Sequence, residues 1–443
     1  MSTYTQSVEK LLALGHELHL TPSAKFDLAH MRVLLDALGH PERRFASVLI
    51  AGTNGKGSTA ATLASILDCA GHRTGLYTSP HLVRINERIR VNGEEISEPE
   101  FAEIHQRVDE ASQRLVAEGR LPWHPSFFET LTAMAFEYFA SAGVEIAVLE
   151  VGMGGRLDAT NVTEPVLSVI TDVALDHQKF LGNTIAEIAR EKAGIIRANG
   201  VLVTLPQHPQ ANDVIGHVAM EKNARAVSAV PYMPNQAPTD GHVAAEPRNR
   251  YSLQVMGETL LVDSPLLGRH QLRNLALAIA AAVELNQFGF KVTPPDIARG
   301  IRATQWPGRL QLLEQDGQQY LLDVAHNPAG AWALRSALST YFADRPLVFV
   351  FAALRDKAIA EMADILFPLA EHVVVTRVDN PRAASPDELR DAAARTGAAL
   401  TCSPTPADAL RAAQALARRN ALVVVTGSIY LVGEALSVLA AST

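Results

Sequence analysis

The chain has 443 residues, 48% of them hydrophobic and 19% charged, which fits a globular protein of two or three domains. The formal net charge of -8 at pH 7 argues against a broad basic surface for nucleic acid or anionic lipid. Only Cys69 and Cys402 are present, so neither a disulfide framework nor a cysteine metal cluster is expected. The sequence lacks a secretory signal and a long apolar stretch, which predicts a soluble, cytoplasmic protein.

The first part of the chain predicts an α/β fold. Helices are expected at residues 5 to 17 and 27 to 38, and after them β-branched runs alternate with helical patterns. This alternation is the βαβ rhythm of a mainly parallel sheet with helices on its faces. The strand candidates are SVLIAG, RTGLYTS, EIAVLEVG, VLSVITDVA and GVLVTLP.

Local signals predict a helix and a hairpin further along. Thr184 and Glu187 have the spacing of a capping box, at the start of a helix that carries Lys192. The stretch YSLQVMGETLLVD is typical of a β-hairpin with Gly257 near its turn.

Prolines predict a domain boundary, which we place at residues 301–308. A first domain is therefore expected at residues 1–300, and a second, smaller α/β domain at residues 309–443. One helix of the second domain is expected to begin with Ser385 as its cap and Glu388 at the capping-box position. Its strand candidates are QYLLDVAHNP, PLVFVFAAL, HVVVTRV and ALVVVTGS.

The stretch AGTNGKGST, residues 51 to 59, lies between a predicted strand and a predicted helix. Backbone N–H groups and a helix N-terminus can hold a phosphate there, while Lys56 neutralises its charge. The standard phosphate loop has a hydroxyl residue directly after its lysine, but here Gly57 intervenes and moves Ser58 one position along. A magnesium ion would therefore need another ligand. The competing interpretation is a glycine-rich turn with an incidental lysine, which this placement disfavours.

Two strand ends offer oxygen ligands. Ser79 follows a predicted strand in TSPHL, although this short motif alone is more typical of a plain turn. Glu150 closes the apolar strand EIAVLE, and the carboxyl ends of parallel strands are where open α/β sheets bind ligands. Magnesium prefers such a carboxylate together with water and phosphate oxygens. The alternative for Glu150 is a solvated acid at a strand end.

The next strand ends in TDVALDHQ, which contains Asp172, Asp176 and His177. We expect this strand to neighbour the Glu150 strand, which would make His177 a candidate metal ligand as readily as a structural histidine. For Lys192, on the following helix, the neighbouring residues in the sequence predict only a solvent-exposed charge.

The second domain repeats the pattern of polar residues at strand ends. Asp323, His326 and Asn327 follow a predicted strand, ahead of a helix expected to begin at Pro328. Ser428 lies at a similar strand end. These residues predict either a ligand-facing edge or ordinary turn and cap chemistry.

Together these stretches resemble folylpolyglutamate synthase and dihydrofolate synthase, within the Mur ligase superfamily. The resemblance covers almost the whole chain in order and implies a Mur-ligase-type central ATPase domain followed by a Rossmann-like glutamate-ligase domain. It rests on AGTNGKGS, TSPHLVRINERIRVNG, LEVGMGGRLDATN, ALDHQKFLGNTIAEIAREKAGI, GRHQLRNLALAI, WPGR, DVAHNP and TGSIYLVGE.

The resemblance also implies roles for individual residues. Ser79 and Glu150 would hold one Mg²⁺, and Glu150, His177 and a carbamylated (N-carboxylated) Lys192 a second. Lys56, Lys192, His177 and His326 would serve catalysis directly. Glutamate would meet His326 and Ser428, and the pterin ligand would meet Phe128 and Asp158. The implied ATP contacts are Thr53, Asn54, Gly55, Lys56, Gly57, Ser58, Gln271, Asn274, Arg309 and Asp323.

The implied reaction is ATP-dependent amide formation through an acyl phosphate. Its substrates would be L-glutamate, ATP, and dihydropteroate or reduced folates, with a monomer acting without nucleic acid or membrane. The motifs favour a bifunctional enzyme, and a monofunctional folylpolyglutamate synthase is the main alternative. A non-catalytic ATP-binding regulator would not need the glutamate-side residues. A peptidoglycan-precursor ligase would need a uridine-nucleotide domain, for which the chain before residue 52 leaves no room.

Overall fold

A computed structural model describes residues 3–15, 27–234, 247–418 and 420–441, and the chain divides into two compact units. The larger unit comprises Met1–Ala237, Tyr251–Val262 and Arg273–Thr304. The smaller unit comprises Pro238–Arg250, Asp263–Leu272 and Gln305–Thr443. None of the helices in the described part of the chain has the length and apolarity needed to cross a membrane.

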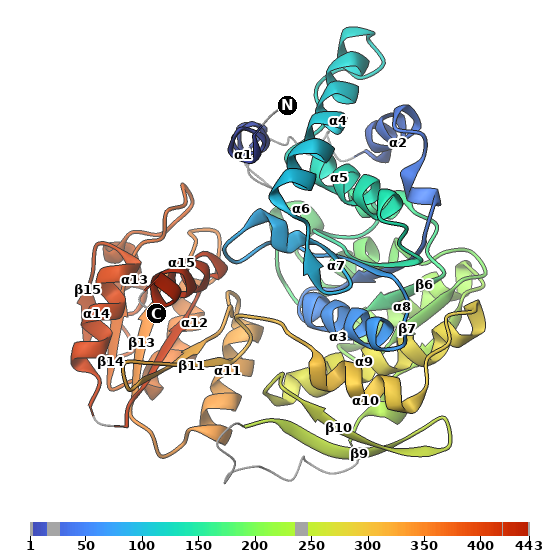
Figure 1. Cartoon of the computed structure of the whole chain (residues 1–443). Helices are drawn as coiled ribbons and strands as arrows, with labels where there is room; N and C mark the ends of the chain where they lie inside the picture. The colour runs from blue at the N-terminus through green and yellow to red at the C-terminus, as the bar shows by residue number, and fades with distance from the viewer. Residues whose placement is uncertain (1–2, 16–26, 235–246, 419, 442–443) are drawn as a thin grey trace. The chain divides into compact units, whose positions relative to one another are not determined.

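The larger unit is built on a mainly parallel sheet, as predicted (Figure 1). Within the described residues its eight strands have the order β4-β3-β2-β5-β1-β6-β7-β8, and only β3 and β4 run antiparallel to their neighbours. The strands are β1 (Ala46–Ala51), β2 (Thr74–Tyr77), β3 (Ile89–Val91), β4 (Glu94–Glu95), β5 (Ile146–Glu150), β6 (Leu167–Ile170), β7 (Val201–Thr204) and β8 (Arg225–Ser228).

This strand order corrects one expectation. The strand that leads to Asp172 and His177 is β6, and it pairs with β1 and β7. Glu150 ends β5, which pairs with β1 and β2. The predicted adjacency of these two strands was therefore wrong, because β1, the strand that feeds the phosphate loop, lies between them.

The first predicted helix begins at Tyr4 and ends at Ala13, and residues 16 and 17 of that prediction lie outside the described residues. The predicted capping box at Thr184 is confirmed, with Thr184 Oγ1 accepting from Glu187 N at 3.2 Å. The helices are α1 (Tyr4–Ala13), α2 (Leu28–Ala37), α3 (Lys56–Cys69), α4 (Glu98–Ala117), α5 (Phe127–Ser141), α6 (Gln178–Leu181), α7 (Ile185–Ala193), α8 (Pro209–Glu221), α9 (Arg269–Leu285) and α10 (Pro294–Ala303).

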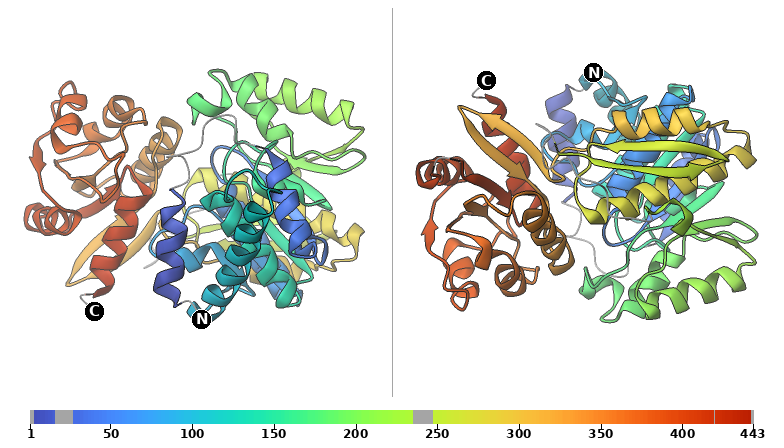
Figure 2. Two further views of the ribbon diagram at one scale, coloured as in Figure 1. Left: turned by 90° about the horizontal axis from the view of Figure 1, so that it is seen from above. Right: turned by 90° about the horizontal axis from the view of Figure 1, so that it is seen from below.

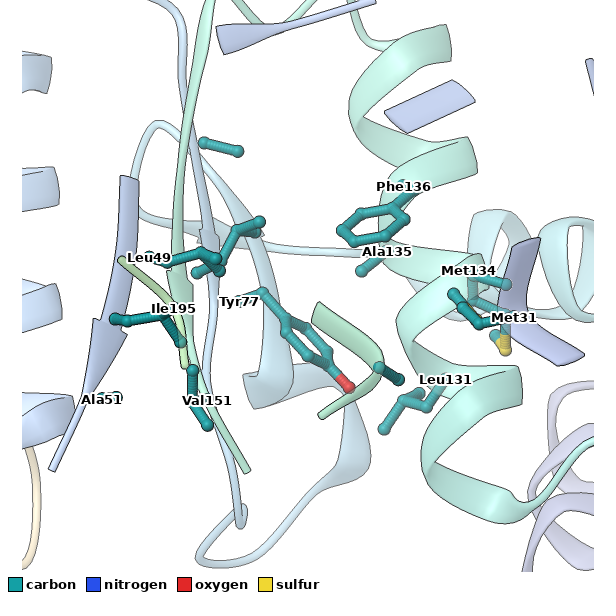
Figure 3. Packing of buried hydrophobic residues seen from close by; sticks show 14 of the residues in the cluster. Met31, Leu49, Ala51, Tyr77, Leu131, Met134, Ala135, Phe136, Val151 and Ile195 are labelled. Atoms are coloured by element: carbon teal, nitrogen blue, oxygen red, sulfur yellow. The ribbon is translucent and has the colours of Figure 1, made fainter. Parts of the chain in front are cut away.

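Both faces of the central strands are buried, which explains why they read as continuous apolar runs. Leu49 of β1 and Tyr77 of β2 face the helix α5, where Phe136 lies in the same core (Figure 3). Val48 and Ile50, the alternate residues of β1, are fully buried as well. Helices α3 and α5 lie on opposite faces of the sheet in Figure 1.

A hairpin of β9 (Asn249–Val255) and β10 (Glu258–Ser264) covers α9 and α10 in both Figure 1 and Figure 2. The predicted hairpin is confirmed. Met256 and Gly257, the two residues of its turn, have φ values of +52° and +86°. Positive φ at both central residues matches the right-handed twist of the flanking strands, and glycine adopts it without strain.

The smaller unit has its own sheet and core. Within the described residues its strands have the order β11-β12-β16-β13-β14-β15, with only β11 antiparallel. The predicted cap at Ser385 is confirmed by its capping box. The elements are β11 (Gln311–Gln315), β12 (Gln318–Leu322), α11 (Pro328–Tyr341), β13 (Leu347–Phe351), α12 (Ile359–Leu366), β14 (His372–Val375), α13 (Pro386–Ala392), β15 (Leu400–Cys402), α14 (Pro406–Leu416), β16 (Leu422–Thr426) and α15 (Ile429–Ala441). A short 3-10 helix of the smaller unit spans Phe367–Leu369, and those of the larger unit span Pro41–Arg43, Ile85–Arg88, Ala159–Val162, Val230–Tyr232 and Asn286–Phe288.

Candidate active site

The glycine-rich loop joins β1 to α3, and Lys56 is the first residue of that helix. Gly55 caps the helix with φ +88°. A Cβ atom at Gly55 would lie 2.2 Å from Asn274 Oδ1, and one at Gly52 would lie 1.7 Å from Thr171 Oγ1. Only glycine fits these two positions, because the loop backbone packs directly against its neighbours. The arrangement places the loop N–H groups at a helix N-terminus, where an anion is favoured.

Lys56, Ser79 and Glu150 come together at the ends of three adjacent strands. Glu150 is the last residue of β5 and is only 4% exposed. Lys56 Nζ lies 4.0 Å from Glu150 Oε1, and Ser79 N donates to Glu150 Oε2 at 3.2 Å. The interpretation of Glu150 as a solvated acid is therefore wrong, because β1 and β2 flank its strand and bury its end. A buried carboxylate beside a serine and a lysine suits a magnesium ion with phosphate groups.

Lys192 is also buried, at 4% exposure, so its interpretation as a solvent-exposed charge was wrong. Helix α7 turns this side chain inward, and Lys192 Nζ donates to the Gly52 carbonyl at 2.8 Å. Burial, the larger cause, and the charge of Lys56 together lower the pKa of Lys192 to about 7. Asp176 and Asp158 oppose this shift. The side chain thus lies beneath the phosphate loop with a weakened affinity for a proton.

His177 precedes the short helix α6 with φ +50°, and its side chain is 31% exposed. Its Nε2 lies 3.9 Å from Asp176 Oδ2. Within the described ranges, no group of three or more His, Cys, Asp or Glu side chains is placed to hold a metal ion. The role of His177 as a metal ligand stays a prediction.

Phe128 and Asp158 both contact the loop that follows β5. The Phe128 ring lies against Gly152, where an added Cβ atom would be 2.5 Å from Phe128 Cζ. The centroids of the Phe128 and Tyr77 rings are 6.0 Å apart. Asp158 accepts from Met153 N at 3.0 Å, so it holds the loop itself. Burial raises the pKa of Asp158, and its hydrogen bonds oppose that rise. Its role toward a pterin ligand stays a prediction.

Helix α9 carries the buried residues Gln271 and Asn274. Asn274 packs on Gly55 of the phosphate loop. Between them in sequence, Arg273 forms an ion pair with Asp172, with Nη2 and Oδ1 2.6 Å apart. The sequence alone predicts no role for Arg273, because a single arginine on a helix does not indicate which distant residue it pairs with.

In the smaller unit, Asp323 follows β12 and is 7% exposed. Its carboxylate accepts from Leu310 N at 3.0 Å and from Ala325 N at 2.9 Å. Burial raises the pKa of Asp323, while the charge of Arg309 and these hydrogen bonds oppose the rise. The structure therefore brings Asp323 and Arg309 together.

His326 and Ser428 lie on adjacent loops at the ends of β12 and β16. Gly427 N donates to the Ala325 carbonyl at 3.1 Å and so joins the two loops. His326 Nδ1 lies 2.9 Å from the Val324 carbonyl, which favours a proton on that nitrogen. Ser428 is 2% exposed. The two strand ends are thus adjacent in the fold, and a ligand-facing role for His326 and Ser428 stays a prediction.

Two family models match the chain. The Mur ligase middle domain matches residues 124–282, and the Mur ligase glutamate ligase domain matches residues 308–429.

Individual relatives cover nearly the whole chain. A dihydrofolate synthase/folylpolyglutamate synthase of Bacillus subtilis is 36% identical over 412 residues, which cover 92% of this chain and 93% of that protein. A folylpolyglutamate synthase of Lacticaseibacillus casei is 36% identical over 367 residues, 81% of this chain and 83% of that protein. Mycobacterium tuberculosis folylpolyglutamate synthase complexed with ADP has a TM-score of 0.88 and 32% identity, over 98% of this chain and 99% of that chain. These matches confirm the resemblance seen in the motifs, and the chain belongs to the dihydrofolate synthase/folylpolyglutamate synthase family of Mur ligases.

Proposed function

We propose that the protein is an ATP-dependent ligase that joins L-glutamate to dihydropteroate, forming dihydrofolate, and to the glutamate tail of reduced folates. The observation that carries this proposal is the convergence of Lys56, Ser79 and Glu150 beside the glycine-rich loop. Membership of a family whose relatives carry both enzyme names supports it.

The reaction would proceed in two steps. The γ-phosphoryl group of ATP passes to the substrate carboxylate and forms an acyl phosphate, with ADP as the leaving group. The amine of glutamate then attacks the acyl carbon, a C–N bond forms, and the C–O bond to phosphate breaks with loss of a proton. Lys56 and the N–H groups at the start of α3 would stabilise the charge on the moving phosphoryl group.

Magnesium fits the donor set around Glu150. The buried carboxylate and the hydroxyl of Ser79 are hard oxygen ligands for one ion. We propose that Glu150, His177 and a carbamylated Lys192 hold a second. When bound, the ions would disperse the charge that develops during phosphoryl transfer.

Carbamylation of Lys192 is supported by its pKa of about 7, because much of the amine is then neutral near pH 7. Only the neutral amine forms a bond to CO₂, releasing a proton and leaving an anionic carbamate. The carbamate nitrogen retains one N–H, so the hydrogen bond from Nζ to Gly52 can persist. A cation under the phosphate loop would thereby become an anionic ligand.

The remaining assignments complete the proposal for a monomeric, cytoplasmic enzyme. Residues 1–300 would form the ATPase domain, residues 301–308 a linker and residues 309–443 the glutamate-ligase domain. His326 and Ser428 would bind glutamate, and the pterin ligand would contact Phe128 and Asp158. The proposed ATP contacts are Thr53, Asn54, Gly55, Lys56, Gly57, Ser58, Gln271, Asn274, Arg309 and Asp323.

Relatives of equal identity carry the bifunctional and the monofunctional name, so a monofunctional folylpolyglutamate synthase is the alternative. The test is phosphate release from ATP and magnesium with glutamate plus 7,8-dihydropteroate, against glutamate plus tetrahydrofolate. Products are identified by mass. Turnover with both acceptors supports the bifunctional enzyme, and turnover with tetrahydrofolate alone supports the monofunctional one. No turnover with either would contradict the proposed ligase.

A further inference from the structure

We propose that Arg273 is a positioning residue for the nucleotide, which holds the phosphate loop in its binding conformation through an ion pair with Asp172. The inference rests on the proposed function in taking ATP as the nucleotide. Neither residue belongs to the proposed catalytic or ATP-contacting set. Their effect would be exerted through the loop backbone.

The phosphate loop is bonded to the segment that follows β6. The carbonyl of Asp172 accepts from Thr53 N at 2.8 Å and from Asn54 N at 3.2 Å. Thr53 Oγ1 donates to the Ala174 carbonyl at 3.0 Å, and Thr171 Oγ1 donates to the Asn54 carbonyl at 2.8 Å. The position of Asp172 therefore sets the position of Thr53 and Asn54.

Arg273 fixes Asp172 with a forked contact. Its Nε lies 3.1 and 3.0 Å from the two carboxylate oxygens, and its Nη2 lies 2.6 Å from Oδ1. The same Nη2 donates to the Pro206 carbonyl at 2.9 Å. The guanidinium is planar and presents several donors in fixed directions, so it restrains the orientation of Asp172 as an ammonium group could not.

Helix α9 holds the other side of the loop as well. Asn274, the next residue after Arg273, packs against Gly55 so closely that no Cβ would fit there. Two consecutive residues of one helix thus contact the loop directly at Gly55 and indirectly at Thr53. Helix α9 is therefore connected to the loop at two points, through Asp172 at Thr53 and directly at Gly55. A loop restrained in this way loses less conformational freedom when it binds a phosphate.

The test is ADP affinity, measured by calorimetry on the intact chain as wild type, Arg273→Ala, Arg273→Lys, Asp172→Ala and the Arg273→Ala/Asp172→Ala double variant. The Asp172–Arg273 pair is partly exposed, at 40% and 28% of the two side chains, so Arg273→Ala should weaken ADP binding about three- to tenfold. Arg273→Lys should restore only part of the loss. The double variant should bind no more weakly than either single variant, because both act through one contact. The KM for ATP should rise by the same factor while the KM for glutamate stays constant.

The matched control is Arg225→Ala, which removes an ion pair between β8 and Glu284 of the same helix α9. It should leave ADP affinity unchanged. Wild-type affinity in Arg273→Ala, additive losses in the double variant, or an equal loss in Arg225→Ala would each overturn the inference while the proposed function stood. A wild-type protein that binds no ADP would overturn both. Thermal midpoints of all variants show that each is folded.

Discussion

At the scale of the single residue, burial decides the chemistry of Lys192. Its pKa of about 7 leaves the amine able to react with CO₂ near neutral pH, and activity should fall below pH 7 as protonation removes the reactive form. Lys192→Arg should lower ligation at least about tenfold, because a guanidinium stays charged and forms no carbamate. The carbamate signal in ¹³C NMR with labelled bicarbonate should disappear in the variant. Unchanged turnover in Lys192→Arg would contradict this role.

Glu150→Gln tests the proposed magnesium ligand with little change in shape. The amide keeps an oxygen but loses the negative charge that balances Lys56 at 4.0 Å. Phosphate release with either acceptor should fall at least about a hundredfold, while the circular dichroism spectrum stays that of the wild type. Normal turnover in this variant would remove the proposed site.

Asp68 is a partly buried acid outside the site, on the last turn of α3. Burial raises its pKa to about 6 against the opposing hydrogen bond from Thr74, and its Oδ1 has no hydrogen-bond partner among the described residues. The folded state therefore binds more protons than the unfolded state between about pH 4 and pH 6. Its contribution to the free energy of unfolding falls across that window as pH rises.

Asp68→Asn removes this charge and its unfavourable interaction with the helix C-terminus. The free energy of unfolding at pH 7.5 should rise by about 1 to 2 kcal/mol, a figure reduced for the partial exposure of the carboxylate. Urea unfolding at pH 4, 5, 6 and 7.5 gives the profile. An equal difference between variant and wild type at all four pH values would refute the shifted pKa.

At the scale of the element, the crossing of α10 over α3 depends on one glycine. A Cβ at Gly300 would lie 2.3 Å from the Cα atom of Ile66, so the backbones must separate to admit it. Gly300→Ala should lower the free energy of unfolding by about 2 kcal/mol or more. The control is Gly216→Ala in α8, where a Cβ meets nothing within 4 Å. That change should raise stability by about 0.5 to 1 kcal/mol, since alanine is the better helix former. Equal effects in urea unfolding would show that the crossing tolerates a side chain.

The sequence predicted individual helices, caps and turns better than it predicted which strands lie next to each other. The cap at Thr184, the cap at Ser385 and the turn at Gly257 follow from residues within four positions of one another. Strand order follows from contacts between segments far apart in the chain. The placement of β1 between β5 and β6 was therefore missed.

At the scale of the whole molecule, the two units have separate cores, so thermal unfolding is not expected to be two-state. Scanning calorimetry should give a calorimetric enthalpy larger than the van't Hoff enthalpy. ADP with magnesium should raise the midpoint at least of the component formed by the larger unit, which contains the phosphate loop. A ligand at a hundred times its Kd stabilises the folded form by about 2.7 kcal/mol. Gly300→Ala should lower the midpoint of the same component, because that residue and the phosphate loop belong to the larger unit. One transition with equal enthalpies would contradict independent cores.

The sequence by itself determined the fold class, most elements, the phosphate loop and the family, because these depend on local periodicity and on motifs in order along the chain. Tertiary structure alone decided the burial of Lys192 and the pairing of Arg273 with Asp172, which are 101 positions apart. A pKa depends on how much water and charge surround a group, and an ion pair depends on which side chains meet. Both arise only when distant segments pack together.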